Sequence, residues 1–486
     1  MARTRTRTAV RGDQEAARAD EGPDPIRAVV GAATHPGGAP EVIKDTAGES
    51  ATGGPPAGRT TLDDALAQGP KGALQLLGPG LITGASDDDP SGIGTYSQAG
   101  SQFGFGTLWL ALFTFPLMVA VQEACARIAL HTGVGLGTSL RRKFPTWVVG
   151  VCIVAVFTAN TVNVGADLGA VGAAGGLLSR GHIQPAWLVV PVALLIGFMQ
   201  LRLAYATIFR VFKLLTLALF AYVITVFVVH PPLLETLKAT FVPHVEFNKN
   251  FIGIVVAVLG TTISPYLFFW QASSEVEEMK AAGAHTEKER RGVTHKELHA
   301  ARIDVFIGML FSQLVMYCII LTSGSVIHAS GNTNIQTAQQ AADALRPLAG
   351  PFAFVLFSAG MIGTGLLAIP VLTGSAAYAV KEFFGFRGSM HEKPSHRPTF
   401  YLLIVIAIIG GLLMNFLNID PIKALVVTAI INGVVAPPIL VLIALLARDR
   451  SVMGDRRSGP WSNGLVWLAT LLMGAAALAL VATLFL

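Results

Sequence analysis

The sequence predicts an all-α integral membrane protein of about eleven transmembrane helices, arranged as two inverted five-helix repeats and one extra helix. Three observations support this fold class. The chain of 486 residues is 52% hydrophobic and only 13% charged, whereas soluble domains carry about 25% charged residues. Apolar stretches long enough to span a bilayer recur along most of the chain. Two of them, five apart in order, are interrupted by proline and polar residues, as in membrane proteins built from inverted repeats.

Residues 1–70 differ in composition, being rich in Arg, Ala, Gly, Pro, Asp and Thr without hydrophobic periodicity. Such a segment cannot bury enough apolar surface to fold alone, so we expect a disordered cytoplasmic tail. The basic start, Arg3 to Arg7, is not followed by an apolar core, which argues against a cleaved secretory signal.

The membrane domain is expected over 71–486, because each of eleven apolar segments there can cross about 30 Å of hydrocarbon. Repeat one covers about 74–229, repeat two about 251–446, and the extra helix about 461–484. The segments are roughly 74–97, 105–131, 146–178, 186–203, 206–229, 251–273, 304–328, 350–380, 399–416, 421–446 and 461–484.

The connections between these segments differ in basic residues. Lys and Arg are concentrated in connections at 141–143, 202–213, 280–302, 381–397 and 448–457, while the alternate connections contain only Arg180, Lys238, Lys249 and Arg346. Basic connections face the cytoplasm. We therefore predict a multi-pass protein of the plasma or inner membrane, with its N-terminus in the cytoplasm and its C-terminus outside.

The first apolar segment contains three consecutive carboxylates, Asp87, Asp88 and Asp89, followed at once by Pro90 and Gly92. A carboxylate at the bilayer centre costs at least about 2.5–3.5 kcal/mol, so it normally faces a cavity, a partner or an ion. Helix breakers at this depth require backbone that is buried in protein or lines water. These features predict a discontinuous helix that carries a cation site.

The sixth segment is interrupted in the same way, by Gly260, Thr261, Thr262, Ser264 and Pro265. The proline cannot donate a helical hydrogen bond, and it frees carbonyl groups one turn back. Carbonyl ends of half-helices carry partial negative charge, and with a carboxylate they form an oxygen-rich cage for a divalent cation. We expect this cation site where the first and sixth segments cross.

Several motifs after residue 70 are shared with a known family. Gly78-Pro-Gly80 and Asp89-Pro-Ser-Gly92 are similar to its Gly-Pro-Gly and Asp-Pro-Gly-Asn motifs, and Gln102–Trp109 and Pro437–Ala444 are similar to parts of its second and tenth helices. The chain thus resembles the Nramp divalent metal transporters, which have the LeuT fold. The resemblance implies a divalent cation importer that works by alternating access.

Departures from the family's motifs indicate which ion is carried. Gly92 stands where the family has Asn, and Ser264-Pro265-Tyr266 replaces Met-Pro-His. Loss of the soft thioether favours a harder ion, and a wider site suits Mg²⁺, which keeps several waters. The pattern resembles the Nramp-related magnesium transporter branch, so we expect Mg²⁺, with Mn²⁺ also carried.

Two groups of the family's proton route are also replaced. Asp167 is retained, but Ala170 stands where the family has Glu, and Tyr266 stands where it has a His that titrates near neutral pH. We therefore predict weak or absent proton coupling.

The resulting candidate site has one main ligand, Asp89. Asp88 is either a further ligand or, like Asp87, a hydrogen-bonded support for the break. Asn432 is expected to form an interhelical hydrogen bond and, with Asp167 and Tyr266, to surround the site or the ion pathway. The complete set of predicted metal ligands is Asp89, Ser86, Gly92, Thr261, Thr262, Ser264 and Asp88.

Two other functions stay open: a proton-coupled Mn²⁺/Fe²⁺ symporter, and a membrane metal sensor or scaffold that does not transport. We expect no enzymatic activity, no cofactor beyond the transported ion and no nucleic acid partner, and the sequence leaves the oligomeric state open. His295 and His299 are four residues apart and could chelate a metal on a helix, but we expect them in a solvated inner loop.

Overall fold

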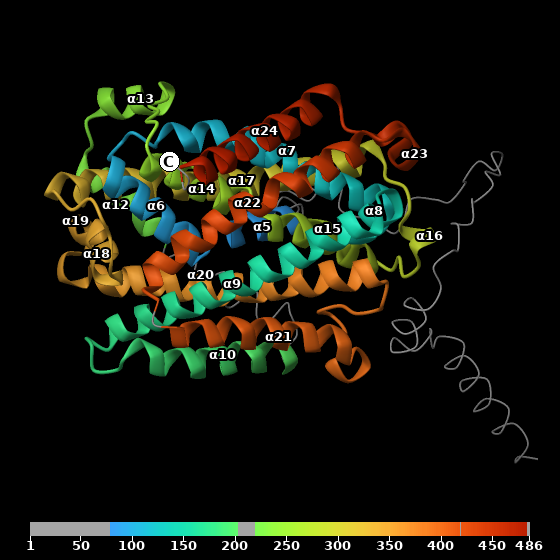
Figure 1. Cartoon of the computed structure of the whole chain (residues 1–486), viewed down its shortest axis with the longest axis horizontal. Helices are drawn as coiled ribbons and strands as arrows, with labels where there is room; N and C mark the ends of the chain where they lie inside the picture. Colours follow the sequence, from blue (N-terminus) through green and yellow to red (C-terminus); the bar gives the residue numbers. More distant parts are fainter. Residues whose placement is uncertain (1–77, 203–218, 418, 484–486) are drawn as a thin grey trace, which may run out of the picture. The chain divides into compact units, whose positions relative to one another are not determined.

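The computed structural model describes residues 78–202, 219–417 and 419–483. Within these ranges the chain forms helices, turns and bends, and no strand (Figure 1). The predicted tail, residues 1–70, and the first part of the predicted fifth span lie outside the described residues.

Nine helical segments in the described part of the chain are long and apolar enough to cross a membrane, and each coincides with a predicted span. The first predicted span instead forms two short helices, α5 (Pro79–Asp87) and α6 (Pro90–Phe103). The fifth is described only in its second part, α12 (Phe220–Val229). The nine segments are α7 (Trp109–Thr132), α9 (Thr146–Leu178), α10 (Pro185–Arg202), α14 with α15 (Lys249–Thr262 and Pro265–Ala281), α17 (His295–Val326), α20 (Ala353–Phe384), α21 (Pro398–Met414), α22 (Pro421–Arg448) and α24 (Pro460–Ala482).

The seventh span was predicted over 304–328, but its helix α17 begins nine residues earlier, at His295. Its start is set by a capping box: the Thr294 hydroxyl accepts the Glu297 N–H, and the Glu297 carboxylate accepts the Thr294 N–H at 2.8 Å. The expectation of a loop for His295 and His299 is therefore wrong, because both belong to the first turns of this helix, although both side chains are exposed as expected.

Helices that occupy the same position in the two repeats pack against each other. α7 contacts α17, α9 contacts α20, and α10 contacts α21, while α5 and α6 contact α15 and α14 (Figure 1). The members of each pair are five spans apart, so they run in opposite directions. This is the arrangement that a two-fold axis in the membrane plane produces, and it confirms the predicted pair of inverted repeats.

α5 lies along one face of α17, and three residues of α17 at four-residue spacing make the contact. The Asp304 carboxylate accepts hydrogen bonds of 2.7–3.0 Å from the backbone N–H groups of residues 78, 80 and 81, so it caps the start of α5. Gly308 and Gly80 bring the two backbones together: a Cβ on Gly80 would lie 2.5 Å from the Val305 nitrogen. Ser312 then reaches the end of α5.

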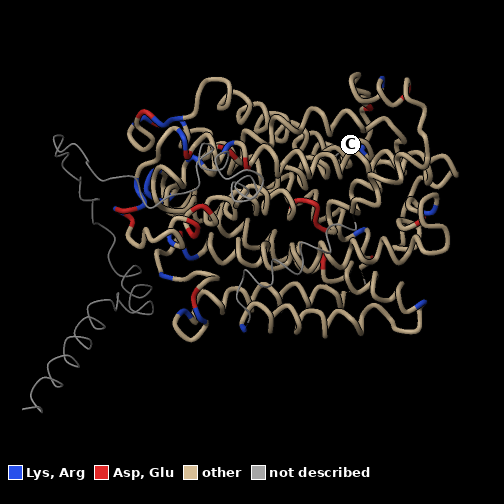
Figure 2. The backbone as a smooth tube through the Cα atoms, turned by 180° about the vertical axis from the view of Figure 1, so that it is seen from behind, with Lys and Arg blue, Asp and Glu red and all other residues tan. Residues whose placement is uncertain are grey.

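Lys and Arg residues gather at one end of the helical bundle (Figure 2). The helices α8 (Leu136–Lys143), α16 (Glu287–Arg290) and α23 (Arg450–Met453) lie there. They are joined by the ion pairs Arg142–Glu287 and Lys143–Asp449, both 2.6 Å long. The basic connections around 141–143, 280–302 and 448–457 thus share one end, as the predicted topology requires. Which side of the membrane they face stays a prediction.

Candidate functional site

The first break separates α5 from α6 at Asp88 and Asp89, as predicted. Asp89 is 1% exposed and forms the N-cap of α6. Its Oδ1 accepts hydrogen bonds from the Ser91 hydroxyl at 2.6 Å and from the Gly92 N–H at 2.8 Å. Its Oδ2 accepts one from the Asn163 side-chain amide on α9 at 3.0 Å. Three donors therefore hold this carboxylate in one orientation.

The second break lies beside the first. The Thr261 hydroxyl is 3.4 Å from the Ser91 hydroxyl, and a Cβ on Gly92 would lie 3.4 Å from the same Thr261 oxygen. The structure thus brings three predicted ligands together: Asp89 and Gly92 of the first break and Thr261 of the second.

Thr262 and Ser264 direct their hydroxyl hydrogens back into α14. Thr262 donates to the Val258 carbonyl at 2.8 Å. Ser264 donates to the carbonyls of residues 260 and 261 at 2.7 and 2.8 Å, so it caps the groups that Pro265 releases. The hydroxyl oxygens of Thr262 and Ser264 keep their lone pairs, which are the part that a cation uses.

Ser86 and Tyr266 connect the two broken helices. The Ser86 hydroxyl donates a hydrogen bond to the Ile82 carbonyl at 2.8 Å. The backbone carbonyl of Ser86 accepts a hydrogen bond from the Tyr266 hydroxyl at 2.8 Å. Ser375 of α20 in turn donates to the Tyr266 carbonyl at 2.6 Å. Tyr266 therefore ties α15 to the end of α5 and occupies one acceptor position of the Ser86 carbonyl.

Asp87 and Asp88 face α17. The Ser312 hydroxyl donates to Asp87 Oδ2 at 2.5 Å and lies 3.4 Å from Asp88 Oδ1. The other oxygen of each carboxylate has no hydrogen-bond partner among the described residues. Both residues are thus attached to the helix that supports the break, as one of the two predicted roles for Asp88 requires.

Two more predicted residues carry buried polar atoms beside the breaks. Asp167 of α9 lies within electrostatic range of Asp89, and Asn432 of α22 precedes Gly433, which packs on Gly260 of α14. The interhelical hydrogen bond expected of Asn432 is not formed, because neither its amide nitrogen nor its amide oxygen has a partner among the described residues. A buried polar atom without a hydrogen-bond partner destabilises the fold by about 1–3 kcal/mol, so bound water or an ion normally supplies the missing partner. Their placement fits a hydrated cation between the breaks.

Three further buried carboxylates, those of Asp87, Asp88 and Asp167, lie within electrostatic range of Asp89. Among the described residues, no group of three His, Cys, Asp or Glu side chains is arranged to hold a metal. Sequence reasoning missed three residues that organise the site: Ser91, Asn163 and Ser312. The spacing of Asn163 and Asp167, one helical turn apart on α9, was a signal that could have identified Asn163.

Together, two interrupted helices that meet at a buried carboxylate inside an inverted repeat define the fold class of secondary transporters. A family model described as natural resistance-associated macrophage protein-like, Nramp, matches residues 80–483. The chain belongs to the Nramp family, as its motifs predicted.

Curated relatives and a solved structure agree with this assignment. The chain is 25% identical over 391 residues to the divalent metal cation transporter MntH of Aeromonas hydrophila, covering 80% of this chain and 90% of that one. It is 26% identical over 392 residues to the MntH of Pectobacterium carotovorum, covering 80% and 89%. The fold is similar to a crystal structure of the Eremococcus coleocola manganese transporter, with a TM-score of 0.65, 15% identity and coverage of 84% and 86%.

Proposed function

We propose that the protein carries divalent metal cations across the membrane by alternating access around Asp89, with Mg²⁺ as the main ion and Mn²⁺ as a second. The observation that carries this proposal is the meeting of both helix breaks at one buried carboxylate. Every candidate ligand there offers oxygen only, which suits a hard ion. The relatives' names, divalent metal cation transporter, support the class of substrate.

The hydrogen bonds of Asp89 support an ion that keeps part of its water. A carboxylate has about four acceptor sites, and donors from Ser91, Gly92 and Asn163 take three of them. One site is left for the ion or for a water bound to it. Mg²⁺ dehydrates reluctantly and typically keeps several waters, so this geometry favours it over an ion that must be fully stripped.

Transport without proton coupling follows from the two replaced groups. Ala170 is buried and apolar, and the Tyr266 hydroxyl is engaged with the Ser86 carbonyl. The membrane potential then supplies the driving force, at about 2.3 kcal/mol per charge per 100 mV, or about 4.6 kcal/mol for a divalent ion.

The alternative is a proton-coupled Mn²⁺/Fe²⁺ symporter. Asp167 favours it, because it places a second buried carboxylate within electrostatic range of Asp89. A protein that binds metal without transporting it is the third function, and a transport measurement separates all three.

The test uses the purified full-length protein in liposomes loaded with metal and pH indicators. Wild type should take up Mg²⁺ without acidifying the lumen, Asp89→Asn should abolish uptake, and Asp455→Asn, an exposed control, should leave it unchanged. Mn²⁺ uptake with lumenal acidification would instead establish the symporter. Binding of metal without uptake of any divalent ion would refute transport.

A further inference from the structure

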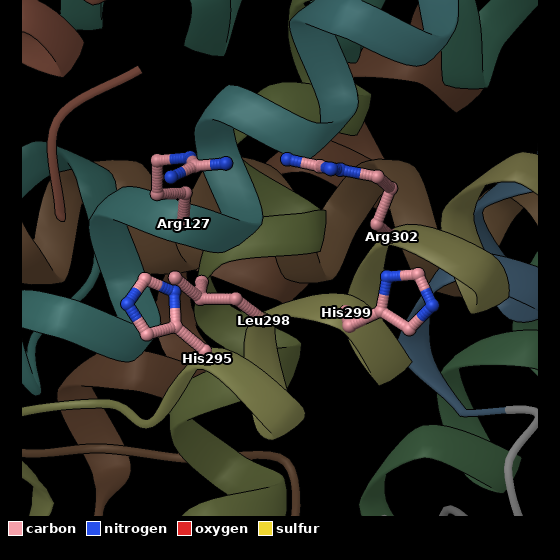
Figure 3. Close-up of a pocket in the computed structure, with 5 residues that line it drawn as sticks. All are labelled: Arg127, His295, Leu298, His299 and Arg302. Carbon is pink, nitrogen blue, oxygen red and sulfur yellow. The ribbon is translucent and has the colours of Figure 1, made fainter. Parts of the chain in front are cut away.

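A second site lies at the basic end of the bundle. It is a pocket of about 340 Å³ between α7 and α17, lined by Arg127, His295, Leu298, His299 and Arg302 (Figure 3). In this view the two guanidinium groups extend toward each other, and both histidine rings lie on the opposite side of the pocket. Four of its five lining residues therefore carry nitrogen donors.

The pocket has an open rim and a buried floor. His295, His299 and Arg302 are exposed and follow one face of α17 at four- and three-residue steps, with Leu298 between them. Arg127 comes from α7 and is only 7% exposed. Its terminal nitrogens donate to the Arg456 carbonyl and the Glu123 carboxylate, and its Nε has no hydrogen-bond partner among the described residues.

The net charge of the side chains that line the pocket favours binding of an anion. Glu123 pairs with both Arg127 and Arg302, and its other oxygen accepts the Ser462 hydroxyl at 3.2 Å. One carboxylate thus faces two guanidinium groups, which leaves a net positive charge beside the histidine rings. This charge opposes metal chelation by His295 and His299, despite their suitable spacing.

An apolar stripe on α17 begins where the pocket ends. Phe306, Leu310 and Leu314 follow Arg302 at four-residue steps and are 45–48% exposed. Phe115 of α7 packs edge-on against Phe306, with ring centroids 5.2 Å apart. The surface therefore offers basic groups at the helix end and apolar side chains toward the membrane interior, which matches the two parts of a phospholipid.

We propose that this pocket binds the phosphate group of an anionic phospholipid, whose acyl chain lies along the apolar stripe. Arg binds phosphate through charge-assisted hydrogen bonds, and basic pockets between membrane helices on the cytoplasmic side are suited to anionic headgroups. Free phosphate has the same charged group as the lipid headgroup, but it has no acyl chain to contact the apolar stripe. No step of metal transport enters this proposal.

The experiment measures lipid binding to the delipidated full-length protein by native mass spectrometry, with phosphatidylglycerol and phosphatidylcholine in competition. Wild type should prefer phosphatidylglycerol. The double variant His299→Gln/Arg302→Gln, which changes only exposed side chains, should weaken phosphatidylglycerol binding at least about tenfold. Arg450→Gln removes an exposed charge outside the pocket at the same end and should leave binding unchanged.

Four results would overturn the proposal. Equal affinity for both lipids, or unchanged phosphatidylglycerol binding in the double variant, would exclude the pocket as a lipid site. Calorimetric binding of inorganic phosphate that the double variant loses, without any lipid preference, would assign the pocket to free phosphate instead. Zn²⁺ binding that His299→Gln abolishes would show that the histidine pair chelates metal.

Discussion

Asn163 is the residue whose removal tests the geometry of the proposed metal site most directly. Its side-chain amide donates the 3.0 Å hydrogen bond to Asp89 Oδ2 and is the donor that reaches this carboxylate from α9. Asn163→Ala leaves the Ser91 and Gly92 donors on Oδ1 in place, so Asp89 keeps its cap but gains freedom to rotate. Metal binding must then order the carboxylate.

The expected loss follows from the type of bond. A hydrogen bond to a charged group contributes about 1.5–3 kcal/mol, and each 1.4 kcal/mol changes an equilibrium constant tenfold. Residues that orient a metal ligand typically account for a 10–100-fold change in affinity. We therefore expect Asn163→Ala to weaken Mg²⁺ and Mn²⁺ binding by about 10–100-fold.

A matched control is present on the same helix. Asn160 is equally buried, and its amide donates to the Leu372 carbonyl of α20 at 3.1 Å, away from Asp89. Isothermal titration should give weaker metal binding for Asn163→Ala only, while thermal unfolding should show similar modest losses for both variants. Equal metal affinities in the two variants would refute the orienting role of Asn163.

Three further predictions concern ion choice, helix packing and pH. Ser264→Met should shift uptake competition from Mg²⁺ toward Mn²⁺ and Cd²⁺, because a thioether prefers softer ions; unaltered competition would contradict the ligand argument. Gly80→Ala should lower the unfolding temperature by an amount equivalent to about 1–3 kcal/mol of overpacking, whereas Gly464→Ala, where an added Cβ meets nothing within 4 Å, should not. Hydrogen bonds from Lys143 and from Ser451 hold the pKa of Asp449 at about 2, below about 3.9 in the unfolded chain. This pair therefore stabilises the fold above pH 4 and loses its effect as the pH falls toward 2. Lys143→Met should cost under about 1 kcal/mol at pH 7, because the pair is partly exposed, and a loss that did not shrink below pH 4 would contradict the assignment.

The family and the fold class were predictable from local chemistry. Runs of about twenty apolar residues mark membrane helices without any tertiary information, and nine of the predicted spans are helices in the described chain. Pro90 and Pro265 each stand at the first position of a helix, directly after a break. A proline lacks the donor that a continuous helix needs at that point, so its place in the sequence is sufficient to locate the interruption.

The seventh span shows where hydropathy misleads. Its charged start reads as a loop, yet the capping box of Thr294 and Glu297 begins α17 at His295. A capping box consists of two polar residues three apart, and in a charged stretch this pattern is easily overlooked. The same misjudged segment supplies three of the four nitrogen-bearing side chains of the basic pocket.

The three adjacent carboxylates show most clearly which features the local sequence predicts and which depend on the tertiary structure. Their cost in a membrane, and the break beside them, follow from residues 87–92 alone. Their different roles do not, because these depend on distant partners: Asn163 is 74 positions from Asp89, and Ser312 is 225 positions from Asp87. Composition and proline placement thus determine the spans and their breaks, whereas the packing of α6 against α9 and of α5 against α17 decides which side chain hydrogen-bonds to each carboxylate. Hydrogen bonds between helices act only over about 3 Å, and the folded bundle alone brings these groups within that distance.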